Sequence, residues 1–214
     1  ENKYLIHLSE IDPLTSVFNK ETTQKLIDQK LKNHEHFCFL ILDVDDFKSV
    51  NDNYGHAVGD KVLKNLSDLF KNHFRQTDIV GRIGGDEFII LIEDEHIAES
   101  RIQSLLKKVN ALKIEELQDF KLSISVGMAF APSNGTTFME LYRHADHALY
   151  QTKRTGKNNY KIYKMDGAGV YQLERNALHR PMVRGTGTPQ DFRSRARCVL
   201  DTGKQEKRRT AQQK

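Results

Sequence analysis

Cysteine is scarce in this chain, and long apolar runs are absent. Only two of the 214 residues are cysteines, Cys38 in an apolar segment and Cys198 in a polar one. This spacing argues against a disulfide framework and favours a reducing compartment. No apolar run reaches the roughly 20 residues that span a bilayer, and no signal peptide opens the sequence. We therefore expect a cytoplasmic domain, which a longer protein could still attach to a membrane.

Acidic residues are scarce at the C-terminal end of the chain. Residues 167–214 carry a net charge of +7, whereas residues 1–166 carry −3, so the overall value of +4 hides an asymmetry. The basic tail is no evidence that the folded part binds a specific nucleic acid. Residues 165–214 lack sustained periodicity, which predicts disorder, or vector-derived or out-of-frame sequence. An arm for nucleic acid or anionic membranes is the alternative.

The apolar pattern predicts alternating helices and strands, without an internal repeat. Residues 1–10 are expected to end a helix or linker that arrives from upstream. The predicted helices cover about residues 20–33, 56–74, 97–112 and 138–154, and the predicted strands cover 37–42, a hairpin at 78–92, 120–130 and 160–163. This order predicts an α+β fold with a central, mostly antiparallel sheet flanked by helices.

The predicted hairpin turns at Gly84 and Gly85, directly before Asp86 and Glu87. Adjacent acids at a turn repel each other, so they contribute little to folding. They are suited to holding a divalent cation against a phosphate group. An ordinary glycine turn with solvated acids is the competing interpretation.

A second acidic segment follows the first predicted strand and begins at Asp43. It could merely be an exposed loop that caps the next helix. If this strand neighbours the hairpin, however, Asp43 and Asp86 face the same volume. A divalent cation would relieve their repulsion and would complete its shell with substrate phosphates.

Four motifs together resemble the GGDEF family, the diguanylate cyclases, over about residues 10–164. They are DPLT at 12–15 with Asn19, DVDDFKSVNDNYGHAVGD at 43–60, RIGGDEF at 82–88 and ADHALYQTKRTGKN at 145–158. The resemblance implies a catalytic domain at 11–164 with a ferredoxin-like, palm-type nucleotidyl cyclase fold. It also implies condensation of two GTP into cyclic di-GMP with loss of two pyrophosphates.

The resemblance assigns roles to individual residues. Asp43, the Val44 carbonyl, Asp86 and Glu87 would hold two Mg²⁺ or Mn²⁺ ions per active site, with Asp86 as general base and Glu87 in support. Gly84 and Gly85 would let the turn approach the nucleotide. The matching substrate-binding positions are Asp46, Phe47, Lys48, Asn51, His56, Asp60, Lys153 and Lys157.

Arg75 and Asp78 match the family's allosteric product site, at which cyclic di-GMP inhibits the enzyme. A surface salt bridge at a helix end is the alternative. His144 and His147 are spaced as a metal pair but lack a third ligand nearby, so we expect surface histidines.

Catalysis in this family implies a homodimer, because one active site holds one GTP. An upstream sensory or coiled-coil domain would regulate it. One alternative is a degenerate module that binds GTP or cyclic di-GMP as a receptor without turnover. Another is a different nucleotidyl cyclase, against which Asp60 argues, since a carboxylate accepts hydrogen bonds from guanine but not from the matching edge of adenine.

Overall fold

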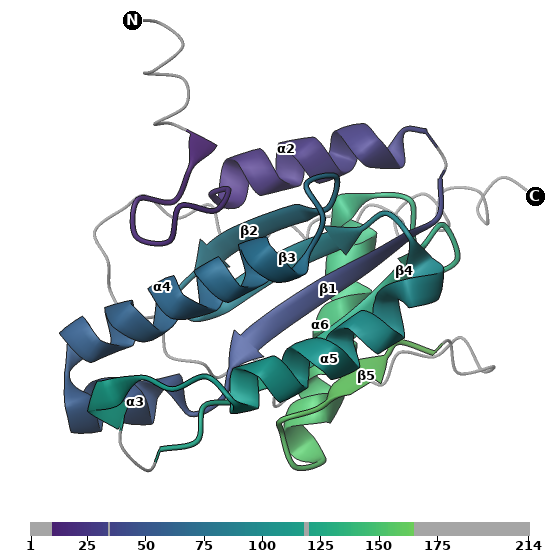
Figure 1. Cartoon of the computed structure of the whole chain (residues 1–214). Helices are drawn as coiled ribbons and strands as arrows, with labels where there is room; N and C mark the ends of the chain where they lie inside the picture. The colour runs from purple at the N-terminus through teal and green to yellow at the C-terminus, as the bar shows by residue number, and fades with distance from the viewer. Residues whose placement is uncertain (1–9, 34, 118–119, 165–214) are drawn as a thin grey trace, which may run out of the picture. The chain divides into compact units, whose positions relative to one another are not determined.

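The computed structural model describes residues 10–33, 35–117 and 120–164 (Figure 1). They belong to the first of two units, Glu1–Met165; the second, Asp166–Lys214, lies outside the described residues. The predictions for residues 1–9 and for the tail therefore stay predictions. No helix within the described ranges is long and apolar enough to cross a bilayer.

A five-stranded sheet forms the middle layer of the fold. Its strands are β1 (Phe37–Val44), β2 (Ile79–Gly84), β3 (Glu87–Ile92), β4 (Ile124–Ala131) and β5 (Tyr160–Ile162), in the spatial order β2-β3-β1-β4-β5. β1 lies in the centre, antiparallel to β3 and β4, and β2 is antiparallel to β3. Only β5 runs parallel to its neighbour, β4. Every residue of β1 is buried, because helices cover both faces of the sheet.

Two pairs of helices form the outer layers (Figure 1). α2 (Lys20–Leu31) packs on β2, and α6 (Phe138–Arg154) packs on β4 and β1. α4 (His56–His73) and α5 (Ala98–Asn110) cover the opposite face. The short helices α3 (Phe47–Tyr54), η1 (Glu95–Ile97) and η2 (Glu115–Leu117) lie in the connections.

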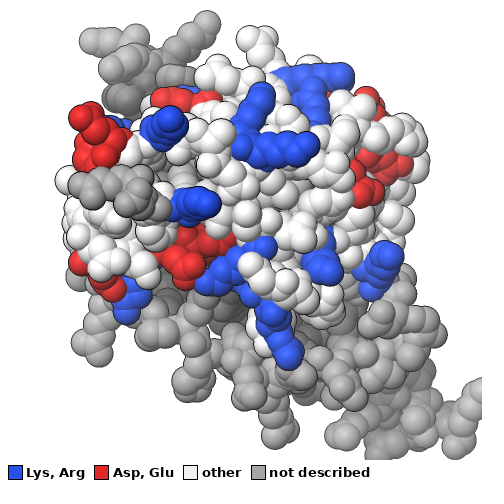
Figure 2. Space-filling model, turned by 60° about the horizontal axis from the view of Figure 1, so that its bottom comes forward, with Lys and Arg blue, Asp and Glu red and all other residues white. Residues whose placement is uncertain are grey.

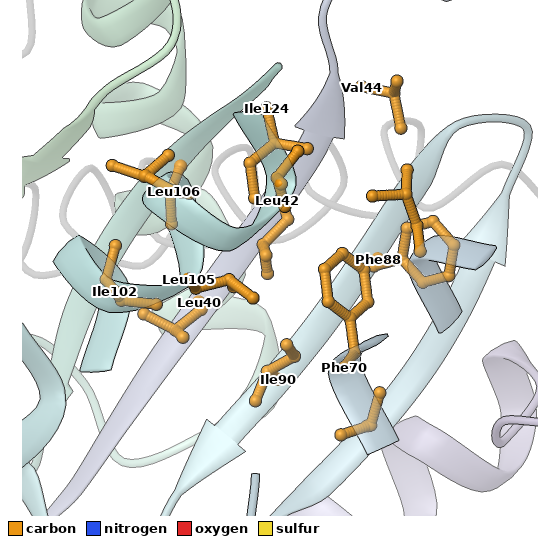
Figure 3. Packing of buried hydrophobic residues seen from close by; sticks show 14 of the residues in the cluster. Leu40, Leu42, Val44, Phe70, Phe88, Ile90, Ile102, Leu105, Leu106 and Ile124 are labelled. Atoms are coloured by element: carbon orange, nitrogen blue, oxygen red, sulfur yellow. The ribbon is translucent and has the colours of Figure 1, made fainter. Parts of the chain in front are cut away.

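The larger part of the core lies between the sheet and the helices α4 and α5. Leu40 and Leu42 of β1 belong to the same buried cluster as Phe70 of α4 and Leu105 of α5 (Figure 3). Alternate residues of a strand point to opposite faces, so the even-numbered residues of β1 fill this side. The odd-numbered residues, Asp43 among them, face α6.

The α6 face is packed at close range. Phe39 of β1 meets Phe138 of α6 edge to face, with 5.5 Å between the ring centroids. On β4, a Cβ atom added to Gly127 would lie only 2.0 Å from the carbonyl oxygen of Ala145. Glycine therefore lets the helix backbone approach the sheet.

The predicted α+β architecture is confirmed, and α6 has the predicted bounds. Two details differ. The sequence pattern missed α3, because Val50 is its only buried residue and leaves no apolar stripe to detect. β4 begins at Ile124, four residues later than predicted, since residues 120–123 are irregular chain.

Candidate active site

The register between β1 and β3 brings two carboxylates to one face of the sheet. Asp43 lies directly opposite Glu87, and opposite residues of an antiparallel pair project to the same side. Asp43 is 3% exposed. Asp86 falls in the turn before β3, where its carbonyl oxygen accepts a hydrogen bond of 3.2 Å from the amide of Val44. The structure thus pairs Asp43 with Glu87, the second of the two acids.

A tyrosine of α6 reaches Glu87. The hydroxyl of Tyr142 donates a hydrogen bond of 2.9 Å to Oε1 of Glu87. The Tyr142 ring stacks on Phe138, one turn earlier in the helix, with 6.0 Å between the centroids. Sequence reasoning missed this residue, because a tyrosine within a helical pattern is more often core than site.

Lys153, near the C-terminal end of α6, and Lys157, in the loop after it, neutralise acids at the end of β1. Nζ of Lys153 lies 2.5 Å from Oδ1 of Asp43, and Nζ of Lys157 lies 2.7 Å from Oδ1 of Asp46. The hydrogen bond to Asp46 raises the pKa of Lys157 above its usual range. Figure 2 shows basic side chains beside acidic ones at several places on the face that it views. The two ammonium groups place positive charge beside the acids at the end of β1.

Asp45 is buried like Asp43, and sequence reasoning gave it no role. Its side chain accepts hydrogen bonds from the hydroxyls of Ser123 (2.7 Å) and Ser125 (2.6 Å) and from the amide of Asn158 (3.0 Å). The residue is 4% exposed. It therefore connects the β1 end to the loop after α6. The only signal in the sequence was its place in the acidic run.

The segment after β1 carries the predicted phosphate and base contacts. Asp46 has a left-handed backbone with φ of 53° and precedes α3, whose first amides have no partner within the helix. Asn51 of α3 lies beside Gly59 of α4, where an added Cβ would lie 2.0 Å from its Oδ1. Asp60 is the next residue of α4. The side chains of Lys48, His56 and Asp60 are exposed.

An arginine fixes the glycine turn of the hairpin. Nε and Nη2 of Arg82 donate to the carbonyl oxygen of Gly85 at 3.0 and 2.8 Å, and Nη1 lies 3.0 Å from Oδ1 of Asp12. Gly84 and Gly85 have φ values of 151° and 52°, which favour glycine. Arg82 thus joins the Asp-Pro turn near the start of the described chain to the acidic turn.

Residues 9–159 match the family model described as "Diguanylate cyclase, GGDEF domain". The chain belongs to the GGDEF family. This GGDEF domain is 32% identical over 184 residues to MucR of Pseudomonas aeruginosa, a bifunctional diguanylate cyclase/cyclic di-GMP phosphodiesterase. It is 34% identical over 163 residues to the diguanylate cyclase DosC of Escherichia coli. The matches cover 83% and 72% of this chain, but only 27% of MucR and 35% of DosC.

Solved GGDEF domains have the same fold. The GGDEF domain of TpbB (YfiN) from Pseudomonas aeruginosa matches with a TM-score of 0.68 and 28% identity, over 72% of this chain and 94% of that chain. The GGDEF domain of DgcB from Caulobacter crescentus, in complex with c-di-GMP, matches with a TM-score of 0.66 and 25% identity, over 72% and 96%.

The two halves of the predicted product site differ in exposure. Arg75 is exposed, whereas the side chain of Asp78 is only 2% exposed. Asp78 accepts hydrogen bonds from the amides of Arg75 (2.8 Å) and Glu93 (3.1 Å), and its ion-pair partner at 3.0 Å is Arg101. In this GGDEF domain, Asp78 shapes the turn that presents the Arg75 side chain.

The prediction of two surface histidines is wrong for His144. That residue is 5% exposed; its Nδ1 lies 2.5 Å from the carbonyl oxygen of Asn134, and its ring stacks on Tyr163 at 4.2 Å. A carbonyl only accepts, so Nδ1 carries the proton. Burial lowers the pKa of His144 below its ordinary value. His147 is exposed as predicted.

The end of β1 fits a hard divalent cation in its donor chemistry. Asp43 and Glu87 present carboxylate oxygens on one face, and Mg²⁺ prefers oxygen ligands. Among the residues that the structure describes, no group of three or more His, Cys, Asp or Glu side chains could form a complete cage. A cation held here would need further oxygens from water, backbone or phosphate, as Mg²⁺ sites in nucleotide enzymes commonly do.

Proposed function

We propose that this GGDEF domain is a diguanylate cyclase, which condenses two GTP into cyclic di-GMP and releases two pyrophosphates. The pairing of Asp43 with Glu87 across β1 and β3, with Lys153 beside it, supports this proposal most strongly. Each 3′-hydroxyl attacks the α-phosphate of the other GTP. A new phosphorus–oxygen bond forms, the bond to pyrophosphate breaks, and the hydroxyl proton passes to a carboxylate, for which Asp86 is our candidate.

Divalent cations would be held by carboxylates of Asp43 and Glu87, with the Val44 carbonyl and Asp86 as further donors. Bound Mg²⁺ or Mn²⁺ would activate the attacking hydroxyl and shield the triphosphate charge. Of the two hairpin acids, Glu87 is the main cation ligand in this proposal, because it lies opposite Asp43 in the sheet.

The substrate contacts of this proposal lie on three segments. The amides of Asp46 and Phe47, together with Lys48, would bind phosphates at the start of α3. Lys153 and Lys157 would leave their acidic partners and contact phosphate oxygens. Asn51 and Asp60 would read the guanine edge, with His56 nearby.

Dimerisation is part of the proposed mechanism. One domain holds one GTP, so the second nucleotide has to come from a facing domain. An upstream sensory or coiled-coil segment would control how the two domains meet. The chain spans only a minor part of the length of MucR and DosC.

Incubation of the chain with GTP and Mg²⁺, followed by chromatography of the products, tests the proposed function. Protein concentration should be varied, because product formation requires a dimer. Asp68→Asn, at an exposed position of α4, serves as a matched control for Glu87→Gln. We expect cyclic di-GMP from the wild type and the control, and none from Glu87→Gln. GTP binding without product at any concentration would indicate a receptor module instead.

A further inference from the structure

Asp45 connects two segments that both carry proposed phosphate contacts. One is the segment after β1, which Asp45 itself begins, and the other is the loop after α6 at residues 156–158. Both of its carboxylate oxygens are engaged, Oδ1 by Ser125 and Oδ2 by Ser123 and the amide of Asn158. Its own amide donates a hydrogen bond of 3.0 Å to the carbonyl oxygen of Ser123. A buried carboxylate with this set of donors stays fixed in place, since each donor would otherwise lose its partner.

The loop on the far side of this carboxylate has an unusual backbone. Gly156, Lys157 and Asn158 have φ values of 115°, 58° and 46°. Left-handed backbone is costly for residues other than glycine, so surrounding contacts have to hold it in place. The Asp45 carboxylate supplies one such contact at the Asn158 amide. Lys157, directly before it, extends its ammonium group to within 2.7 Å of Asp46.

We infer that Asp45 is a positioning residue, which acts through Lys157. It would fix the 156–158 loop so that Lys157 stays beside the amides of Asp46 and Phe47, where the terminal phosphates of GTP would bind. Asp45 itself would touch neither cation nor nucleotide, because its oxygens already accept three hydrogen bonds. This inference rests on the proposed function of the site.

A double-mutant cycle between Asp45→Asn and Lys157→Ala tests the inference. The probe is 3′-deoxy-GTP with Mg²⁺, which lacks the attacking hydroxyl, and GMP serves as the comparison because it lacks the terminal phosphates. We expect Asp45→Asn to weaken 3′-deoxy-GTP binding about tenfold, the value of one charge-assisted hydrogen bond. GMP binding should change less than about twofold. The double variant should bind no more weakly than Lys157→Ala alone, because the two residues act as one unit.

Amide hydrogen exchange at Asn158 gives a second readout, which requires no nucleotide. It should accelerate in Asp45→Asn and remain unchanged in the control Asp68→Asn. Ser123→Ala removes one donor to the carboxylate and should give an intermediate effect, which covers the case in which Asp45→Asn fails to fold.

Unchanged 3′-deoxy-GTP binding in Asp45→Asn, additive effects in the cycle, or equal losses for GMP would each overturn the inference. Failure of the wild type to bind 3′-deoxy-GTP would instead overturn the proposed function, and this inference with it. The two failures are therefore distinguishable.

Discussion

The hydroxyl of Tyr142 lies 2.9 Å from Oε1 of Glu87, so a residue of α6 holds an acid of the hairpin in place. Tyr142→Phe removes only this hydroxyl and keeps the stack on Phe138. A hydrogen bond to a charged group contributes about 1.5–3 kcal/mol. Cyclic di-GMP formation should therefore fall on the order of tenfold to a hundredfold, measured as kcat/KM for GTP.

Tyr150→Phe is the matched control for this change, since Tyr150 lies on the same helix and is 37% exposed. It should leave turnover unchanged. Mn²⁺ binding gives an independent readout, because a less fixed Glu87 should bind the cation more weakly. Equal turnover and equal Mn²⁺ affinity in Tyr142→Phe and the wild type would show that Glu87 does not depend on this hydroxyl.

Replacement of Lys153 should change the affinities of the site for a cation and for GTP in opposite directions. Its ammonium group lies 2.5 Å from Oδ1 of Asp43, where a cation is proposed to bind. Lys153→Met should strengthen Mn²⁺ binding in the absence of nucleotide, because the cation no longer competes with an ammonium group. It should weaken GTP binding about tenfold, through loss of a phosphate contact. Calorimetric titration of each ligand checks both signs, and a loss of Mn²⁺ affinity would contradict the competition.

The exposed Arg75 should carry most of the product inhibition that the sequence predicts. The buried Asp78 carboxylate accepts a hydrogen bond from the amide of Arg75 and forms an ion pair with Arg101. The Arg75 side chain is therefore the group that a phosphate or guanine can reach. Arg75→Ala should raise the concentration of cyclic di-GMP that halves GTP turnover by about tenfold or more, while the uninhibited rate stays the same. Identical inhibition curves for variant and wild type would place the inhibitory site elsewhere.

Stability should rise with pH through the titration of buried His144. Burial lowers the pKa of this histidine below the ordinary value of 6.5. The unfolded chain therefore binds more protons than the folded one between the two values, and the free energy of unfolding decreases as pH falls through about 6.5. Urea denaturation between about pH 5 and pH 8 measures this slope.

His144→Gln should flatten the slope, whereas His147→Gln, at an exposed position of the same helix, should leave it unchanged. Part of the slope will remain in His144→Gln, because burial also lowers the pKa of His73. A slope that is the same in both variants would mean that His144 does not contribute to it.

Local pattern predicted most of the fold, because the long helices bury one face each and the inner strands consist mostly of apolar residues. α3 escaped prediction, since only Val50 among its residues is buried. The acids of the site could be named from the sequence, but not which of them face each other. Whether Asp43 meets Asp86 or Glu87 depends on the register between β1 and β3, and a shift of one residue reverses the answer.

Tyr142 and Asp45 could not have been assigned from the sequence. Their roles arise from partners that lie 55 and 78 or more residues away along the chain. No local pattern distinguishes a tyrosine that holds a carboxylate from one that fills a core. Only the packing of α6 against the sheet decides this.

Gly127 contributes no side chain to the site, yet it sets the distance from the sheet to the helix that carries Tyr142 and Lys153. A single methyl group at this position would overlap the backbone of α6 at Ala145. The helix would have to move outward and would carry both site residues with it. Gly127→Ala would thus impair the site by moving α6 relative to the sheet, without altering any chemical group of the site.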